Sequence, residues 1–416
     1  MPCKIGRREA TMKFDTQIDA KEYDAFVCSH PLCNLLQSSK WANIKADWDS
    51  LRCGVRDEKG KLIASALVLI RHLPLGKTMF YLPKGPILDY HQEEVVHFFL
   101  DSLKKVGKSY HCIYIKMDPG ILKNCYKVDA YEDSIYPEAK QQVNVLRQCG
   151  CIHLGYTKSL EDTVQPRFHA AVRKVDDFES TLPKHTKRHL ATARKKFVTV
   201  DICDASRVDD FAKLMASTEE RKQIKLRDAA YYRRLLQTYG DDARLFLACI
   251  DLEKLLEDSK VKLTKVQSDI VKCKEKDAGK KASLEKNRDA LENDIIALQE
   301  YIQKDGQRVP VAGALGVIYG TTCEMLYMGM DSKYRRYMGP YLSHITPMLY
   351  AFEHGCTLCN MGGVEGTLDD GLTKFKANFN PDILEYIGEF DLPINRFLYH
   401  GAQYALKVRK KMLHRH

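Results

Sequence analysis

The sequence predicts a mixed α/β protein made of two similar lobes, with a helical hairpin inserted into the second lobe. Strand-like and helix-like segments alternate up to about residue 160, and a comparable order recurs over 165–384. Between the strand-like runs 245–250 and 311–319, apolar residues follow a 4–3 spacing over 252–273 and again over 284–302. This spacing is typical of two antiparallel helices that pack along a coiled-coil seam. The hairpin therefore leaves a globular body and returns to it.

The first lobe is expected to contain three helices and four strands before the chain enters the second lobe. The predicted helices cover 19–27, 38–45 and 93–106, and the predicted strands cover 51–56, 61–71, 79–82 and 111–117. A strand at 383–390 and a helix at 393–411 are expected to return to this lobe.

The second lobe repeats a comparable order of elements. Its predicted helices cover 184–197, 208–222, 229–239 and 340–354, and its predicted strands cover 245–250, 311–319, 323–328 and 357–361. No long Gly/Ser linker joins the lobes, which favours a fixed cleft between them. The predicted domains are 1–164 with 385–416 for the first lobe, 165–250 with 306–384 for the second lobe, and 251–305 for the arm.

The hairpin forms an arm whose reach suggests a large partner. Two helices of about 20 to 25 residues each extend roughly 30 to 35 Å at 1.5 Å per residue. Basic residues outnumber acidic ones around the turn, whereas the root of the arm is acidic. Arg288 falls on a core position of the coiled-coil pattern, which leaves self-association through the arm as an alternative.

Composition indicates a folded cytosolic protein that is attracted to polyanions. The chain has 416 residues, 44% of them hydrophobic, which is enough for two well-buried domains. No apolar leader and no run of 18 apolar residues are found, so the 14 cysteines are expected to be reduced. The net charge of +10 indicates nucleic acid, anionic lipid or phosphorylated substrates as partners. The basic residues gather at the arm tip, in 184–196 and in 407–415.

Several common ligand-binding motifs are missing from the sequence. Neither GxxxxGK[ST] nor GxGxxG is present, so a nucleotide triphosphatase and a dinucleotide dehydrogenase have little support. Cys356 and Cys359 have CxxC spacing, but no second pair lies at zinc-ribbon distance, which does not favour a metal or redox site.

The sequence Arg-Tyr-Met-Gly-Pro-Tyr at 336–341 opens a predicted helix after a strand. It is similar to the RxxGxG/A loop with which N-acetyltransferases wrap the coenzyme A pyrophosphate in backbone amides. Pro340 removes one such amide, and Tyr341 replaces the small residue of that loop. An acyltransferase-like layout is therefore favoured, whereas coenzyme A binding is not.

The stretch 360–379 combines a glycine-rich segment with an aromatic–cation pair. Four glycines are expected to let the backbone approach a ligand, namely Gly362, Gly363, Gly366 and Gly371. Phe375 and Lys376 then place a ring and a cation side by side. The alternative is a plain connection between a strand and a helix, with a surface lysine.

These segments resemble the Fem family of peptidoglycan aminoacyltransferases (FemABX), in order and over nearly the whole chain. The matching segments are Gln37-Ser-Ser-Lys-Trp41 with Lys45, Lys84-Gly85-Pro86, Asp118-Pro119, Gln165-Pro166-Arg167, Lys187-Arg188, Arg227 with Tyr231 and Tyr232, and Gly371-Leu-Thr-Lys-Phe-Lys376. Within the family, residues 73–76, 79–81 and 226–232 are most similar to the MurM branch.

The resemblance implies two acetyltransferase (GNAT)-like lobes around a cleft and a coiled-coil arm like the tRNA-binding arm of seryl-tRNA synthetase. It implies transfer of Ala, Ser or Gly from aminoacyl-tRNA to the stem-peptide lysine side chain of lipid II, which builds the peptidoglycan interpeptide bridge. The implied partners are aminoacyl-tRNA, lipid II or its nucleotide precursor, and the inner face of the cytoplasmic membrane, which a cytoplasmic enzyme would contact peripherally. No cofactor, metal or catalytic nucleophile is implied, because ester aminolysis depends on alignment, deprotonation and oxyanion stabilisation.

The matched motif positions also imply roles for individual residues. Lys45 and Arg227 would clamp the diphosphate of the muramoyl precursor, with Tyr231 assisting them. Lys376 would face the acyl-tRNA end, where it would hold the terminal phosphate or stabilise the oxyanion. Phe375 would offer a stacking face to a 3'-terminal base.

Asp118 matches a carboxylate proposed as the general base. An aspartate with an ordinary pKa near 4 is a poor base for an alkylammonium group unless its environment raises that pKa. Orientation of the amine by Asp118, with unassisted or substrate-assisted proton transfer, is the alternative. The lysines expected to contact tRNA at the arm tip are Lys274, Lys276, Lys280 and Lys281.

Two other functions fit part of the sequence. A coenzyme A dependent N-acyltransferase of GNAT type would use the altered loop at 336–341. A non-catalytic tRNA-binding or coiled-coil protein would explain the arm, but it leaves the Phe375–Lys376 and Arg227–Tyr231 pairs without a role.

Overall fold

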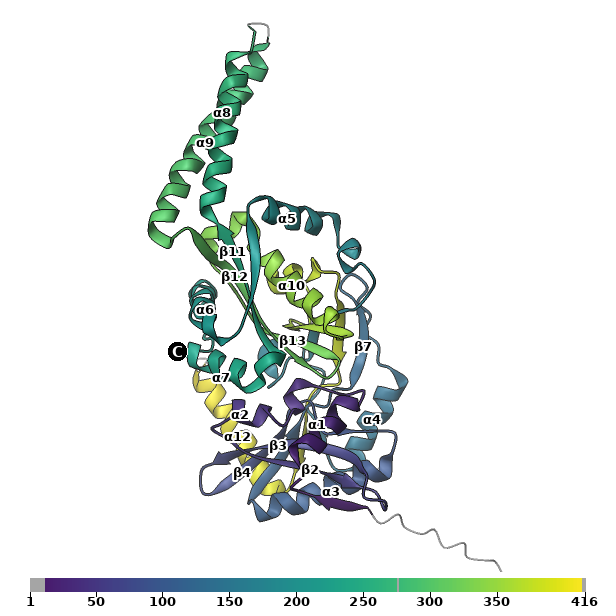
Figure 1. Ribbon diagram of the computed structural model, residues 1–416. Coiled ribbons are helices and arrows are strands. Elements are labelled where there is room, and N and C mark those ends of the chain that lie inside the picture. The colour runs from purple at the N-terminus through teal and green to yellow at the C-terminus, as the bar shows by residue number, and fades with distance from the viewer. Residues whose placement is uncertain (1–11, 275–276, 414–416) are drawn as a thin grey trace, which may run out of the picture. The chain divides into compact units, whose positions relative to one another are not determined.

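Figure 1 shows the computed structural model of the chain, which describes residues 12–274 and 277–413. The chain forms two compact units. The first unit comprises Met1–Asp176, Val317–Glu324 and Ala351–His416, and the second comprises Asp177–Gly316 and Met325–Tyr350. The domain limits predicted from the sequence lie at other positions and stay a prediction. Lys276 and residues 414–416 lie outside the described residues.

A mixed sheet forms the core of the first unit. Its strands lie in the order β1-β2-β3-β4-β6-β16-β8, with β5 paired to β3, and only the β4–β6 pair among those described is parallel. The bounds are β1 Lys13–Asp15, β2 Asp49–Arg56, β3 Leu62–Leu73, β4 Lys77–Leu82, β5 Ile87–Leu88, β6 Cys112–Met117, β8 Ile152–His153 and β16 Phe390–Pro393.

Strand β3 and helix α3 show how the sequence builds this core. The run from Ala64 to Ile70 is buried at every position, as expected for a strand covered on both faces. Helix α3 places Val96, Phe99 and Leu103 on one buried face at helical spacing, and acidic residues occupy its first turn. The helices of this unit are α1 Ala20–Ser29, α2 Trp41–Ile44, α3 Glu93–Ser109, α4 Pro137–Gln148, α11 Gly371–Ala377 and α12 Arg396–Leu413.

A second set of strands in the first unit has the order β14-β9-β15-β7, with every pair antiparallel. The bounds are β7 Leu122–Lys127, β9 Phe168–Arg173, β14 Leu358–Val364 and β15 Asp382–Tyr386. Residues 322–324 pair in parallel with 358–360, so Glu324 lies beside Asn360. This pairing joins segments that are far apart in the sequence.

The second unit contains four strands in the order β10-β11-β12-β13. The bounds are β10 Val198–Cys203, β11 Ala243–Asp251, β12 Arg308–Tyr319 and β13 Thr322–Met330, and the helices are α5 Lys184–Lys195, α6 Val208–Lys222, α7 Ala229–Tyr239 and α10 Gly339–Glu353. The boundary between the units falls within β12 and β13.

The predicted hairpin is present as helices α8, Leu252–Val271, and α9, Ala278–Asp305, which run antiparallel between β11 and β12 (Figure 1). The Asp251 carboxylate caps α8 by accepting from the Lys254 amide, and Leu252 and Leu255 are buried at the root. The mixed α/β fold with an inserted antiparallel helical hairpin is therefore confirmed. Within the described residues, no helix has the length and apolar character needed to cross a membrane.

Two predicted elements differ from the structure. The single strand expected at 383–390 is two strands, β15 and β16, which belong to different sheets. Gly388 has a φ of 90° between them, and this left-handed conformation interrupts the extended backbone. The helix expected at 38–45 is reduced to Trp41–Ile44, with a 3-10 turn at Leu35–Gln37 before it.

Candidate functional site

Three segments of the first unit bring ionisable side chains together in its interior. They are the turn after β4, the end of β6, and the β14–α11 region with its neighbouring strands. We name the five residues Lys84, Asp118, His169, Glu324 and Lys376 the buried cluster. Four of them are at most 8% exposed, and Glu324 is partly accessible. Charges with so little water around them interact strongly with each other.

Asp118 directly follows β6 and is held by the turn after β4. Its Oδ1 accepts hydrogen bonds from the Tyr81 hydroxyl at 2.9 Å and from the Lys84 amide at 3.1 Å. Its Oδ2 lies 3.3 Å from the Lys84 Nζ, and no described residue gives this oxygen a directed hydrogen bond. Burial raises the pKa of Asp118, although the Lys84 charge opposes the shift. The carboxylate is thus a stronger base than an ordinary aspartate.

Lys84 occupies a turn that a buried glutamine shapes. Its φ of 53° is left-handed, and the Gln37 Nε2 donates to the Pro83 carbonyl at 2.7 Å. A Cβ on Gly85 would come within 2.7 Å of the Gln37 amide, so the turn requires glycine there. The Lys84 Nζ lies 4.0 Å above the ring of Tyr386. The turn therefore fixes the ammonium between Asp118 and an aromatic face.

Lys376 lies on the short helix α11, which Asp370 caps through the amides of Leu372 and Thr373. Its Nζ donates to the carbonyls of Gly362 at 3.0 Å and Gly363 at 2.8 Å. Burial lowers the pKa of Lys376 to about 7, against the opposing charge of Asp370. Lys376 is therefore not the surface lysine of the alternative interpretation.

The glycines near Lys376 serve packing more than the sequence suggested. A Cβ on Gly363 would lie 2.4 Å from the Pro166 ring, and one on Gly366 would lie 2.4 Å from the Phe168 ring. These two glycines accommodate side chains of the protein itself, whereas Gly371 faces open space. The expectation that all four glycines let the backbone approach a ligand is therefore wrong for Gly363 and Gly366.

His169 and Glu324 complete the buried cluster around Asn360. The His169 Nδ1 lies 2.9 Å from the Asn360 Nδ2, and the His169 Nε2 lies 3.1 Å from the Pro166 carbonyl; a neutral ring with its proton on Nε2 satisfies both contacts. Burial, reinforced by the Lys84 and Lys376 charges, lowers the pKa of His169 to about 3. Burial raises the pKa of Glu324 to about 7, while a hydrogen bond from Asn360 and the Lys84 charge oppose the shift.

Sequence analysis did not select Lys84, His169 or Glu324 as site residues. Lys84 could have been selected from the sequence, because the Lys84-Gly85-Pro86 turn is one of the segments that resemble the family. His169 and Glu324 lie on strands without a local motif, and only the pairing of β14 with β9 and β13 brings them to Asn360.

Arg167, from another family-like segment, belongs to a structural ion pair. Its Nη1 donates to the Glu385 Oε1 at 2.9 Å and to the Tyr386 carbonyl at 2.8 Å, and its Nε donates to the Thr157 carbonyl at 2.7 Å. Lys123 also pairs with Glu385, at 3.0 Å. This fully engaged arginine fixes the strands that support Tyr386.

Arg227 and Tyr231, which the resemblance places together, contact each other in the second unit. The Arg227 guanidinium lies 5.1 Å above the ring of Tyr231, and the Tyr231 ring lies 5.9 Å from that of Tyr327. Burial raises the pKa of Tyr231, and the nearby Tyr327 adds to the shift. Lys45 belongs to the first unit, where it is half-buried at the end of α2.

The remaining predicted residues lie at the end of α11 and on the arm. Phe375 is half-buried, and its ring lies 5.8 Å from that of Phe379. Lys274, Lys280 and Lys281 are exposed beside the turn of the hairpin. In the loop at 336–341, the Arg336 Nη1 contacts the Asp294 carboxylate at 2.7 Å, so the arginine is engaged by the arm.

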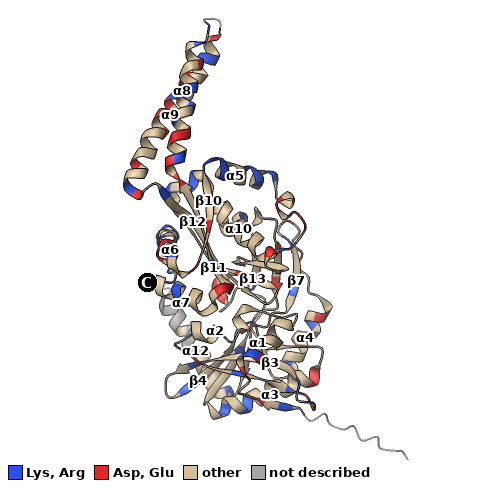
Figure 2. Cartoon of the chain, viewed as in Figure 1, with Lys and Arg blue, Asp and Glu red and all other residues tan. Residues whose placement is uncertain are grey.

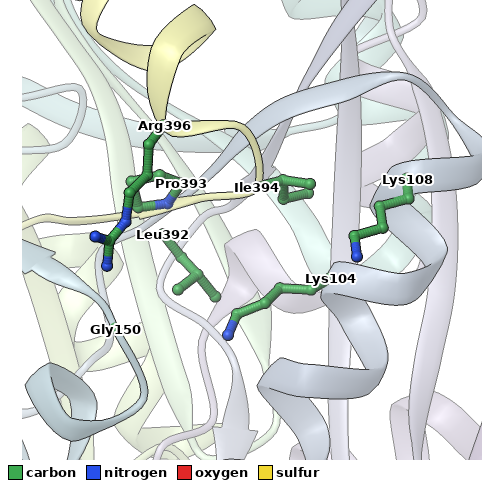
Figure 3. A pocket seen from close by; sticks show the side chains of 7 residues that line it. All are labelled: Lys104, Lys108, Gly150, Leu392, Pro393, Ile394 and Arg396. Atoms are coloured by element: carbon green, nitrogen blue, oxygen red, sulfur yellow. The ribbon is translucent and has the colours of Figure 1, made fainter.

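A separate pocket of about 380 Å³ opens in the first unit, at the start of α12 (Figure 3). Its lining residues are Lys104, Lys108, Gly150, Leu392, Pro393, Ile394 and Arg396. The Lys104 ammonium contacts the Asp101 carboxylate at 2.9 Å. None of the predicted site residues lines this pocket.

Comparisons with known proteins agree on one family. The FemAB family model matches residues 18–407. Aminoacyltransferase FemA of Staphylococcus aureus (strain bovine RF122 / ET3-1) is 28% identical over 425 residues, covering 96% of this chain and 99% of that protein. FemA of Staphylococcus epidermidis (strain ATCC 12228 / FDA PCI 1200) is 27% identical over 425 residues, covering 96% of this chain and 100% of that protein.

A solved structure gives the same result. The crystal structure of FemX has a TM-score of 0.75 and 28% sequence identity, and the match covers 93% of this chain and 99% of FemX. The predicted transferase activity is confirmed, and a non-catalytic arm protein no longer explains the chain. The chain belongs to the FemAB family and is an aminoacyltransferase.

Proposed function

We propose that this enzyme transfers Ala, Ser or Gly from aminoacyl-tRNA to the stem-peptide lysine side chain of lipid II, as one step in building the peptidoglycan interpeptide bridge. Membership of the FemAB family and the likeness to FemA and FemX support a transferase of this kind. The observation that carries the chemistry is Asp118, a buried carboxylate with a raised pKa and one oxygen without a directed hydrogen bond.

Asp118 would act on the attacking amine. In the reaction the lysine nitrogen bonds to the acyl carbon, the ester C–O bond breaks, and the 3'-terminal ribose oxygen leaves with a proton. The amine must lose a proton on the way, and a carboxylate with a raised pKa accepts it more readily than an ordinary aspartate does. Oδ2, which pairs with the Lys84 ammonium but receives no directed hydrogen bond, would accept the N–H of the amine, while the Tyr81 hydroxyl and the Lys84 amide keep the carboxylate in position.

Lys376 would stabilise the oxyanion that forms on the acyl carbonyl. An ammonium group has three N–H donors, and the carbonyls of Gly362 and Gly363 take two of them. The third would meet the developing negative charge, in a dry site where such an interaction is strong. Phe375, next to Lys376 on α11, would stack on the terminal base of the donor.

The remaining predicted residues would hold the two substrates. Lys45, Arg227 and Tyr231 would bind the diphosphate of lipid II or its nucleotide precursor, because a guanidinium fork and an ammonium suit phosphate oxygens. Lys274, Lys276, Lys280 and Lys281 at the arm tip would contact tRNA. Since lipid II is a membrane lipid, the enzyme would work in the cytoplasm at the inner membrane face.

One assay tests this function directly. The purified enzyme is incubated with alanyl-, seryl- or glycyl-tRNA and lipid II that carries a stem lysine, and the products are identified by mass spectrometry. The expected product is lipid II heavier by one amino acid on the lysine side chain, from at least one of the three donors. Acyl transfer from acetyl-coenzyme A, with none from any aminoacyl-tRNA, would contradict the proposal.

A further inference from the structure

Helix α5 concentrates positive charge on the surface of the second unit. Lys184, Lys187, Arg188, Arg194 and Lys195 are all exposed, and no acidic residue lies between Lys184 and Lys195. In Figure 2 the helix has basic residues towards both ends and no acidic residue along it. The Arg194 guanidinium is partly offset by Glu179, at 2.7 Å.

This arrangement is unfavourable for the isolated helix. The positive end of the helix dipole coincides with Lys184, Lys187 and Arg188, while Pro183 provides no side-chain cap and the first turn contains no acidic residue. Lys184 and Arg188 are also like charges at i and i+4. A bound polyanion would relieve both costs, since anions are favoured at a helix N-terminus.

Aromatic rings lie beside this charge. The His189 ring of α5 is 4.7 Å from the Tyr341 ring in the first turn of α10. Arg335 is exposed in the 3-10 turn Ser332–Tyr337, which directly precedes α10, and its charge opposes the rise that burial gives the pKa of Tyr341. Cations interleaved with aromatic rings are typical of surfaces that bind a nucleic acid strand.

The arm lacks such an excess of charge. Between Asp251 and Asp305 the sequence contains twelve Lys and Arg residues against thirteen Asp and Glu residues. Only its tip is basic, and acidic side chains alternate with basic ones along the rest of both helices (Figure 2). Helix α5 is therefore the stronger attraction for a polyanion in this unit.

The exposed face of α5 does not suit a membrane surface. Interfacial helices insert large apolar side chains next to their basic residues. The buried residues of α5, Thr186, Leu190 and Ala193, face the protein, and Ala191 is the one exposed apolar residue of the helix, so no large apolar side chain lies outside. An extended phosphate backbone fits this face better, since Lys184 and Lys195 lie roughly 17 Å apart at 1.5 Å per residue.

We propose that the basic face of α5, together with Arg335, is the main docking surface for the phosphate backbone of the tRNA donor. This inference rests on the proposed function, in which aminoacyl-tRNA is the donor. Docking along α5 would hold the body of the donor by charge and leave its acylated end available for the reaction. The contact would read no base sequence, because phosphates carry none.

The test compares variants that lose the same charge. The variant Lys184→Gln/Arg188→Gln/Lys195→Gln removes three charges from α5, Lys274→Gln/Lys280→Gln/Lys281→Gln removes three from the arm tip, and Lys21→Gln/Lys59→Gln/Lys61→Gln removes three exposed charges of the first unit. KM and kcat are measured with full-length aminoacyl-tRNA and with an aminoacylated 3'-terminal tetranucleotide. Circular dichroism checks that each variant is folded.

We expect the α5 variant to raise the KM for full-length aminoacyl-tRNA about 10-fold or more, and to reduce the slope of log KM against log salt by about 2. The KM for the tetranucleotide and the kcat should stay within about twofold of the unaltered enzyme, as should every constant of the first-unit variant. An unchanged tRNA KM in the α5 variant, or an increase confined to the arm-tip variant, would overturn the inference.

Two further outcomes separate this inference from its alternatives. If the unaltered enzyme uses no aminoacyl-tRNA, the proposed function fails before α5 is tested. If the α5 variant keeps its tRNA KM but no longer floats with vesicles of phosphatidylglycerol, the face is a membrane contact and the inference is wrong.

Discussion

The buried cluster in the first unit and helix α5 in the second both contain charged side chains, but the two regions differ in how far water reaches those charges. In the buried cluster, loss of water brings the pKa of Lys376 and that of Glu324 to about 7. On α5, five cations remain in water and are screened by salt. Burial shifts the pKa of such a side chain towards neutral pH, so that it can donate or accept a proton. An exposed cation keeps its charge and attracts anions. We therefore assign the proposed chemistry to a buried part of this enzyme and the proposed docking to an exposed part.

The largest effect is expected from Asp118→Asn, which removes the raised-pKa carboxylate while keeping its shape. We expect kcat for transfer to fall by about 10²- to 10⁴-fold, as is typical for loss of a general base. Single-turnover transfer to lipid II measures this, with melting temperature as a check on folding. Asp129→Asn, at an exposed position, is the matched control. If Asp118→Asn kept full activity, Asp118 would not be the general base of the reaction.

Lys376→Met should reduce kcat by about 10²- to 10³-fold, the loss typical of one oxyanion donor. Methionine is of similar length and apolar, so it fills the buried space without leaving an unpaired charge. Lys374→Met changes an exposed lysine of the same helix and should leave kcat near its normal value. Unchanged turnover in Lys376→Met would remove Lys376 from the reaction.

Within the buried cluster, His169 should make the first unit less stable in acid, whereas Glu324, with its pKa raised to about 7, contributes in the opposite direction. His169 has its pKa lowered to about 3 in the folded chain, so below pH 6.5 the unfolded chain binds the proton first. Stability then falls as pH falls from 6.5 towards 3, by about 1.4 kcal/mol per pH unit for this group. Urea unfolding at pH 6.5, 5.5 and 4.5 measures the slope of the free energy of unfolding against pH, which should be less positive in His169→Gln than in the unaltered protein. An equal slope in both proteins would contradict a neutral buried histidine.

Arg227→Ala should raise the KM for lipid II by about 10-fold, because a charge-assisted contact to phosphate is lost. The KM for aminoacyl-tRNA should not change. Arg234→Ala, an exposed position on α7, the helix that carries Tyr231, serves as the control. If only the tRNA KM increased, the assignment of this aromatic–arginine pair to the acceptor would be reversed.

Removing the arm should have the smallest effect. Replacement of residues 252–302 by a short loop retains Asp305, which contacts Lys333 and Tyr334 at the base of the arm. Because the arm is close to neutral overall, we expect the tRNA KM to rise by only about threefold, and the lipid II KM by less. A rise larger than that of the α5 variant would make the arm the main tRNA surface and reverse the order of the two regions.

Secondary-structure elements that depend on a pattern in consecutive residues were predicted correctly from the sequence. The 4–3 spacing predicted the hairpin, and the β3 strand followed from an apolar run. The strand expected at 383–390 failed because nothing local shows that Gly388 adopts a left-handed φ and sends the chain into a second sheet. Motifs were enough to select Asp118 and Lys376 as candidate site residues, but they did not show the surroundings that change the pKa values of these two side chains.

The sequence by itself determined the mixed α/β fold, the inserted hairpin, the family, and the basic character of α5, because each is written in spacing, motif or composition. Only the tertiary structure decided that Lys84 and Tyr81 hold Asp118, and that Asn360 joins His169 to the strand that contains Glu324. The physical reason is that proton affinity depends on burial and on neighbours contributed by distant strands. The charged residues can be read from the sequence, but only the fold determines which of them are buried away from water.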